Sequence, residues 1–163
     1  MGATRVGFGI GSNVGDAYAN VGAALRLLQE REIARLDAIS RIYRTRPWGV
    51  TEQEDFANAC AIGWTEMSAY ALLAAVKRVE ADMGRVPSRR WGPRIIDVDI
   101  LFLGDSILDD PDLTIPHKEL FSRAFVLAPL AEIAPDLVLG GVRVGEAAAA
   151  ADLTGIGPWR ADR

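Results

Sequence analysis

The centre of the chain reads Arg89-Arg90-Trp91-Gly92-Pro93-Arg94-Ile95-Ile96-Asp97-Val98-Asp99-Ile100-Leu101-Phe102-Leu103. Residues 96–103 are apolar except for two carboxylates near the start, which predicts a strand. Because successive side chains on a strand point to opposite faces, Asp97 and Asp99 share one face, with their β-carbons roughly 6–7 Å apart, and Val98 faces the other way. The stretch therefore predicts a strand that presents paired carboxylates directly behind an arginine-rich turn.

Two neighbouring carboxylates repel each other unless a cation lies between them. Hard oxygen ligands suit Mg²⁺, which keeps several waters and takes its remaining ligands from substrate phosphates. The preceding loop supplies positive charge for phosphates, because a guanidinium can bind two phosphate oxygens at once. Its arginines are Arg85, Arg89, Arg90 and Arg94. A structural alternative, in which Asp97 and Asp99 only pair with nearby arginines at a partly buried strand end, is equally compatible with the pair taken alone.

The bulk composition predicts one domain over residues 1–163, with a single core, because the chain has 163 residues and 50% of them are hydrophobic. No apolar run approaches the roughly 18 residues of a membrane span, and the start of the chain lacks a secretory pattern, so we expect a cytoplasmic protein. The net charge of −4 argues against non-specific binding to nucleic acid or membranes. Cys60, the only cysteine, excludes an internal disulfide and a cysteine-based metal cluster.

The periodicity of apolar residues predicts the element order β, α, β, β, α, β before the C-terminal part of the chain. The ranges are a strand at 6–10, a helix at 17–28, a strand within 36–43, a strand at 56–64, a helix at 68–83 and the strand at 96–103. Loops are expected at 45–54 and 85–94, followed by a short strand near Ile107 and a helix at 122–131 that Pro135 ends. This order is typical of an α+β, ferredoxin-like fold, with a mainly antiparallel sheet flanked by helices and a C-terminal extension.

The glycines in Gly7-x-Gly9-x-Gly11 lie between a predicted strand and helix, where a dinucleotide-binding fingerprint would lie. The spacing does not fit, because Val14 occupies the position of the last glycine and Gly15 comes one residue too late. Close backbone packing at a tight turn is the favoured interpretation, and a nicotinamide-dependent oxidoreductase is a minor alternative.

Other candidate residues are weak individually. Glu80 is expected in the last turn of its helix, where a negative charge opposes the macrodipole, although an i, i+3 pair with Lys77 would also explain it. His117 is the only histidine and has Arg123 six residues on, which hints at an anion site, but a lone histidine is commonly a loop or capping residue. Four aromatic residues could stack on a flat ring or pack in the core. They are Trp48, Phe56, Trp91 and Phe125.

Taken together, these residues resemble the 6-hydroxymethyl-7,8-dihydropterin pyrophosphokinase family of the folate pathway. The resemblance follows family order over about residues 6–139 and is most specific in Arg90-Trp91-Gly92-Pro93-Arg94-x-x-Asp97-x-Asp99-Ile100-Leu101. Its other motifs are Gly11-Ser12-Asn13, Tyr43-Arg44-Thr45, Asp55-Phe56-x-Asn58, Glu80, Gly84-Arg85, Pro116-His117 and Arg123-x-Phe125.

The resemblance implies that Asp97 and Asp99 hold two Mg²⁺ ions between the ATP phosphates and the pterin hydroxyl. The hydroxyl attacks the β-phosphorus, AMP leaves and no dedicated general base is needed. The implied catalytic positions are Arg85, Arg94, Asp97, Asp99 and His117. The implied ATP-binding positions are Lys77, Glu80, Arg85, Trp91, Arg94, Ile100, Thr114, His117, Lys118 and Arg123, with Ile100 and Thr114 beside the adenine.

For the pterin, the resemblance implies a sandwich between Phe56 and Phe125. Asn58 and the backbones of Thr45 and Gly11 would read the edge of the ring. The remaining implied substrate contacts are Trp48, Trp91 and Asp97.

Loops 45–54 and 85–94 correspond to the family's covering loops, which close after ATP binds and carry Trp48 and Trp91 over the site. Two departures from the family pattern are Pro87, where an arginine is common, and Trp48, where an aliphatic residue is common.

The sequence thus predicts a monomeric, Mg²⁺-dependent pyrophosphokinase that uses ATP and a pterin and has no nucleic-acid or membrane partner. The main alternative is a non-catalytic nucleotide- or pterin-binding module on the same scaffold, which would bind ATP without releasing AMP. Paired carboxylates that face each other argue against this alternative, because a binding module has no use for their repulsion.

Overall fold

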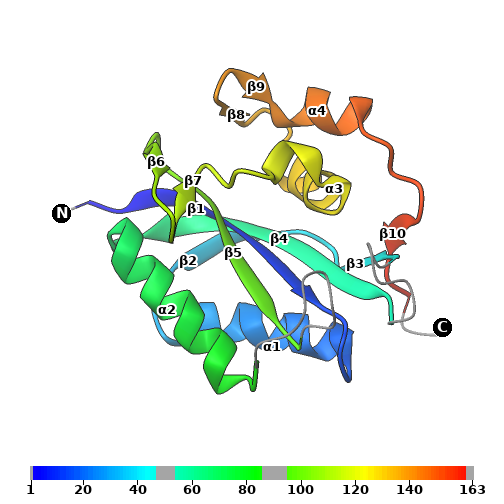
Figure 1. The fold of residues 1–163 in the computed structure, drawn as a ribbon, viewed down its shortest axis with the longest axis horizontal. Helices are drawn as coiled ribbons and strands as arrows, with labels where there is room; N and C mark the ends of the chain where they lie inside the picture. The colour runs from blue at the N-terminus through cyan, green and yellow to red at the C-terminus, as the bar shows by residue number, and fades with distance from the viewer. Residues whose placement is uncertain (1, 47–53, 86–94, 161–163) are drawn as a thin grey trace.

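The computed structural model describes residues 2–46, 54–85 and 95–160. An antiparallel sheet runs through the centre, in the order β10-β3-β4-β1-β5, with β2 also paired to β4. Helices α1 (Ala17–Glu30) and α2 (Ala69–Asp82) cover one face, α3 (Ala124–Ile133) covers the other, and α4 (Val144–Ala150) packs on α3 (Figure 1). The α+β class with a mainly antiparallel sheet is confirmed.

The strands of the central sheet lie close to the predicted ranges. They are β1 (Thr4–Ser12), β2 (Arg35–Ile39), β3 (Tyr43–Thr45), β4 (Phe56–Thr65), β5 (Asp97–Leu103) and β10 (Ile156–Pro158). Two small hairpins, β6 (Leu108–Asp109) with β7 (Thr114–Ile115) and β8 (Val138–Leu139) with β9 (Val142–Arg143), stand outside it. A 3₁₀ turn, η1 (Leu120–Ser122), precedes α3. Among the described residues, no helix has both the length and the apolar character needed to cross a bilayer.

The strand predicted within 36–43 is present as β2, but the prediction missed a further strand, β3, which begins at Tyr43. Between them the hydroxyl of Ser40 accepts the backbone N–H of Cys60 and donates to the carbonyl of Arg41. A side chain that bonds to the backbone in this way competes with the ladder of the sheet. The break therefore comes from local side-chain chemistry that alternation of apolar residues does not reveal.

The C-terminal part also differs from the prediction. The helix expected at 122–131 begins at Ala124 and ends at Ile133, with the backbone N–H of Ala134 bonded to the carbonyl of Leu130. The extension contributes α4 and, beyond it, β10, which adds an edge strand next to β3. Sequence patterns gave no indication of this last strand, since its pairing partner lies more than a hundred residues away.

The alternating glycines lie inside β1 and not in a tight turn, which corrects the expectation above. Val6, Phe8 and Ile10 are buried in the core beneath α1 and α2. Gly7, Gly9 and Gly11 therefore occupy the opposite face, the one that α3 covers. Because β1 pairs antiparallel with both β4 and β5, it also lacks the parallel neighbours of a dinucleotide-binding unit.

Each glycine leaves room for a particular neighbour. A β-carbon on Gly7 would lie 2.2 Å from the ring of Phe102, and one on Gly9 would lie 3.3 Å from Leu101. At Gly11 the nearest atom would be the side-chain nitrogen of Asn58, at 2.9 Å. Gly7 and Gly9 thus make room for the side chains of Phe102 and Leu101. Gly11, at the other end of the row, leaves the surface of the sheet uncovered next to Asn58.

Replacing Gly7 by alanine is expected to destabilise the protein by about 1–3 kcal/mol, because the ring of Phe102 is buried and has to move. Thermal unfolding measures this, with roughly 2–4 °C expected for each kcal/mol. Gly157→Ala in β10 is the control, since a β-carbon there meets nothing within 4 Å. Equal unfolding temperatures for the two variants would contradict the expectation.

Candidate active site

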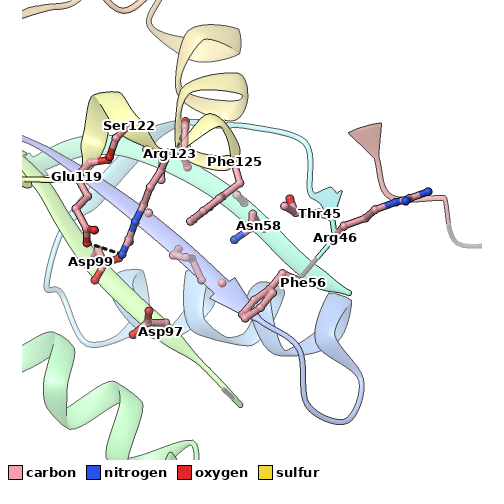
Figure 2. Close-up of a pocket in the computed structure, with 16 residues that line it drawn as sticks. Thr45, Arg46, Phe56, Asn58, Asp97, Asp99, Glu119, Ser122, Arg123 and Phe125 are labelled. Atoms are coloured by element: carbon pink, nitrogen blue, oxygen red, sulfur yellow. Dashed lines mark hydrogen bonds and ion pairs between the residues drawn. The ribbon is translucent and has the colours of Figure 1, made fainter. Parts of the chain in front are cut away.

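A cavity of about 190 Å³ opens on the α3 face of the sheet. Its floor is the glycine end of β1 with the neighbouring residues of β4, and its walls come from β3, β5 and the segment from η1 to α3 (Figure 2). The lining contains these predicted site residues: Gly11, Thr45, Phe56, Asn58, Asp97, Asp99, Arg123 and Phe125. Five separate segments of the chain therefore bring residues singled out in the sequence into one cavity.

Two phenyl rings mark one end of the cavity. Figure 2 shows Phe125 extending from α3 and Phe56 standing at the start of β4, with the side chain of Asn58 between them. Both rings are half-buried and line the cavity. The guanidinium of Arg123 lies 5.5 Å from the centre of the Phe125 ring, which helps to hold that ring in place. A flat ring system could stack on these phenyl groups, as the sequence predicts.

Buried polar atoms without partners lie at the same end. Within the described ranges, the Thr45 hydroxyl and the Asn58 side-chain oxygen make no hydrogen bond, although the two residues are only 4% and 6% exposed. An unpaired buried polar group costs about 1–3 kcal/mol. Both residues line the cavity, so these two atoms are suited to bond with a polar ligand inside it. The sequence predicted only the backbone of Thr45 as a contact and missed its hydroxyl.

The paired carboxylates stand at the other end of the cavity. In β5, Asp97 lies opposite Gly11 and Asp99 lies opposite Gly9. Asp97 lies 3.5 Å from the guanidinium of Arg85, and Asp99 lies 3.6 Å from that of Arg123. These distances are longer than good hydrogen bonds, so oxygen lone pairs on both carboxylates stay free to bind a cation.

The donor set fits Mg²⁺ better than a metal that the protein alone would enclose. In residues 2–46, 54–85 and 95–160 there is no group of three or more histidine, cysteine or acidic side chains placed to hold a metal ion. Mg²⁺ is commonly bound by one or two carboxylates, with waters and substrate phosphates completing its shell. Asp97 and Asp99 both line the cavity, so a substrate phosphate that enters it can reach both carboxylates.

Asp99 is electrostatically strained without a cation. Burial and the nearby charge of Asp97 raise its pKa to about 7, and Arg123 offsets this only in part. A carboxyl whose pKa is raised on folding loses stabilisation as the pH rises from its ordinary value of about 4 through 7. Above pH 7 the metal-free protein therefore carries a destabilising charge.

This charge gives a stability prediction. In EDTA at pH 8, Asp99→Asn is expected to unfold at a higher temperature than the wild type, by about 1–2 kcal/mol or several degrees, because asparagine has no charge to bury. At pH 5 the difference is expected to shrink, because Asp99 is then protonated. Scanning calorimetry at both pH values measures the effect. Identical unfolding temperatures at pH 8 would show that Asp99 is not strained.

Glu80 connects α2 to the carboxylate strand. It is only 3% exposed and accepts the backbone N–H of Val98, at 2.7 Å, between the two aspartates. It also accepts a bond from Arg85 at 2.9 Å and one from Lys77 at 3.4 Å. The i, i+3 pair with Lys77 therefore exists, but the two shorter bonds of Glu80 connect it to the backbone of β5 and to the side chain of Arg85. These cations also compensate a negative charge in the last turn of a helix.

His117 is set up as a hydrogen-bond donor. Its Nδ1 accepts the backbone N–H of Glu119 at 3.1 Å, so in the neutral ring the proton sits on Nε2. Burial and the charge of Arg123 lower its pKa, which keeps the ring neutral at neutral pH. Nε2 lies 3.8 Å from Asp99, so this N–H points toward the carboxylate end of the cavity.

Of the predicted ATP contacts among the described residues, only Arg123 lines the cavity. The lining does not include Lys77, Glu80, Arg85, Ile100, Thr114, His117 or Lys118. The side chain of Ile100 is 4% exposed and packs in the core on the other face of β5, which leaves only its backbone for a contact with adenine. Thr114 lies in β7 opposite Asp109, and Lys118 follows His117 directly. Trp48, Trp91 and Arg94 lie outside the described residues.

Sequence reasoning missed three polar residues that line the cavity, Arg46, Glu119 and Ser122. Glu119 accepts a bond of 2.7 Å from Arg123, and this i, i+4 spacing was a signal that could have been used. Arg46 directly follows Thr45 at the cavity rim, and Ser122 ends η1. Their spacing carries no comparable signal, since only the packing of α3 over β3 brings them together.

Comparison with known proteins identifies the family that the chain is similar to. A family model described as 7,8-dihydro-6-hydroxymethylpterin-pyrophosphokinase (HPPK) matches residues 7–135. The 2-amino-4-hydroxy-6-hydroxymethyldihydropteridine pyrophosphokinase of Methylorubrum extorquens is 47% identical over 94% of this chain and 97% of its own length. The enzyme of the same name from Pseudomonas aeruginosa is 40% identical over 93% of this chain and 94% of its own length.

Among solved structures, Plasmodium falciparum HPPK-DHPS with pteroate has a similar fold, with a TM-score of 0.73 over 90% of this chain. The match spans 42% of that longer chain, at 14% sequence identity. At this level of identity the similarity concerns the fold alone.

Proposed function

The chain belongs to the 7,8-dihydro-6-hydroxymethylpterin-pyrophosphokinase family, whose members transfer a pyrophosphoryl group from ATP, and we propose that the cavity on the α3 face is where it does so. The acceptor is the hydroxyl of 6-hydroxymethyl-7,8-dihydropterin and the reaction serves folate biosynthesis. One observation carries the assignment of the site. At one end of the cavity, the unpartnered Thr45 hydroxyl and Asn58 side-chain oxygen lie beside two phenyl rings, and at the other end a carboxylate pair is flanked by arginines.

The aromatic end fits the pterin. Phe56 and Phe125 would stack on the two faces of the ring. The hydroxyl of Thr45 and the amide of Asn58 would bond its polar edge, which satisfies two atoms that are otherwise buried without partners. The hydroxymethyl arm then points along the cavity toward Asp97 and Asp99. In this arrangement the protein positions the acceptor and excludes water around it.

The carboxylate end fits the phosphates. Arg85, Arg123 and the Nε2–H of His117 would bind and orient phosphate oxygens, and Glu80 holds both Arg85 and the backbone between the aspartates. We propose that Asp97 and Asp99 together hold two Mg²⁺ ions. When bound, Mg²⁺ would offset the phosphate charge and lower the proton affinity of the pterin hydroxyl. No side chain at this end is needed as a general base. The monomeric state and the cytoplasmic location stay predictions of the sequence.

The activity is tested by incubating the protein with ATP, Mg²⁺ and 6-hydroxymethyl-7,8-dihydropterin and separating the nucleotides. We expect AMP in an amount equal to the pterin pyrophosphate formed, and loss of turnover in EDTA. ADP as the sole product would refute pyrophosphoryl transfer. Binding of ATP without any AMP release would favour the non-catalytic binding module.

A further inference from the structure

A break in the sheet lies beside the proposed pterin pocket. The pairing of β2 with β4 ends at Ile39, and the pairing of β3 with β4 begins at Tyr43. Strand β3 is only three residues long, yet it ends on Thr45, whose unpartnered hydroxyl faces the cavity. The ladders to β4 and β10 hold Thr45 itself, opposite Phe56 and Ile156, so a further contact at Arg41 and Tyr43 fixes where this short strand begins.

Glu132 bridges this break from α3. Its carboxylate accepts the backbone N–H of Arg41 at 2.9 Å and the side-chain Nε of Arg41 at 3.1 Å. It also accepts the hydroxyl of Tyr43 at 2.5 Å. Burial would raise the pKa of Glu132, but the bonds from Tyr43 and Arg41 outweigh burial and lower that pKa. The carboxylate is therefore a charged acceptor shared by the residues on either side of the start of β3.

The position of Glu132 on its helix is unfavourable by itself. It lies in the last turn of α3, where a negative charge opposes the helix macrodipole. Phe125 lies seven residues earlier, which is two turns along the same face of the helix. The helix thus places the phenyl wall of the cavity at one end and the contact with β3 at the other.

We propose that Glu132 is a positioning residue for the pterin, because it locks α3, which carries Phe125, to β3, which carries Thr45. The proposal rests on the proposed function of the cavity. It predicts a much larger effect on the pterin than on ATP. The carboxylate pair and Arg85 are held by β5 and α2 and not by this contact. Arg123, at the start of α3, is held separately by Asp99 and Glu119.

The test is steady-state kinetics of Glu132→Ala with each substrate varied in turn. We expect the KM for the pterin to rise roughly 10-fold, with the KM for ATP unchanged within about two-fold. Glu132→Gln keeps an acceptor and is expected to recover part of the pterin affinity. Equal changes in both KM values, or a pterin KM within about two-fold of the wild type, would overturn the proposal.

A matched control separates positioning from general stability. Asp37 also accepts three hydrogen bonds, two from Arg5 and one from Trp64, but it lies on β2 at the far end of the sheet from the cavity. Asp37→Ala is expected to lower the unfolding temperature about as much as Glu132→Ala while leaving both KM values unchanged. A rise of the pterin KM in this control would overturn the proposal.

A milder variant covers the case in which Glu132→Ala does not fold. Tyr43→Phe removes one of the three bonds and keeps the buried ring, so a smaller rise of the pterin KM alone is expected, and no rise would overturn the proposal. Release of AMP by the wild-type protein is measured first. If AMP appears, a normal pterin KM in the variants rejects the role of Glu132 and not the pyrophosphokinase activity.

Discussion

Replacing Asp97 or Asp99 by alanine is expected to lower kcat by about 1,000-fold or more, because either change removes a carboxylate from the end of the cavity where phosphate charge has to be compensated. The loss should appear chiefly in kcat, since the pterin contacts at Phe56, Asn58 and Phe125 are untouched and, of the two aspartates, only Asp97 is an implied pterin contact. Release of AMP measured at saturating ATP and pterin gives the rate. Calorimetric titration with Mg²⁺ and a non-hydrolysable ATP analogue is expected to show weakened binding of the metal complex.

The control for this result is Asp136→Ala, which removes an exposed carboxylate paired with Arg143 on the C-terminal hairpin, away from the cavity. We expect normal turnover in this variant. Circular dichroism and thermal unfolding would show that Asp97→Ala and Asp99→Ala keep the fold. Near-normal rates in both of these variants would reject the assignment of the carboxylate pair, including the proposal that it holds Mg²⁺.

Replacing Gly11 by valine is expected to raise the KM for the pterin roughly 100-fold while leaving ATP binding nearly unchanged. A β-carbon at Gly11 would already lie 2.9 Å from the amide nitrogen of Asn58 and 4.0 Å from the ring of Phe56. The branched side chain would displace the amide that reads the pterin edge and would fill part of the cavity. The two KM values and a direct titration with the pterin measure the effect.

Gly22→Val is the matched control, because Gly22 lies in α1 on the opposite face of the sheet. Apart from the helix backbone, the only atom of the described residues near a β-carbon there is the flexible end of Arg26 in the same helix, at 3.7 Å. This variant should bind the pterin normally. If Gly11→Val also bound the pterin normally, the glycine end of β1 would not be the floor of the pterin site. If it lost ATP affinity to the same extent, the separation of the cavity into two ends would be wrong.

These two sets of variants separate the two ends of the cavity. The aspartate variants test the end that faces the phosphates, and Gly11→Val tests the end that faces the ring. Because β5 carries the first and β1 the second, and the two strands are direct neighbours, a nonspecific distortion of the sheet would affect both ends together. If the aspartate variants lose kcat and Gly11→Val loses pterin affinity, misfolding therefore does not explain the two results.

Parts of the site that depend on local geometry were predictable. Asp97 and Asp99 lie on one face of β5 because strand geometry repeats every two residues, and this holds wherever the strand is placed. The same rule puts Gly7, Gly9 and Gly11 on one face of β1, although the sequence interpretation assigned them to a turn. Family resemblance then indicated which segments meet, without showing how they are held.

Contacts between distant segments were not predictable. Glu80 looked like half of a surface pair with Lys77, and only the packing of α2 against β5 shows that it bonds the backbone of Val98. Glu132 carried no signal at all, because its partners Arg41 and Tyr43 lie about ninety residues away. The orphaned hydroxyl of Thr45 is likewise a consequence of burial by several elements at once.

The sequence by itself determined the alternation that gathers the carboxylates on one side of a strand, the α+β class and the family, because these follow from short-range periodicity and from motifs contiguous in the chain. Tertiary structure alone decided where β2 breaks from β3, which carboxylates are buried, and which polar atoms are left without partners in the cavity. The physical reason is that burial and hydrogen-bond partners depend on residues brought together across the sheet, and no local pattern specifies which those residues are.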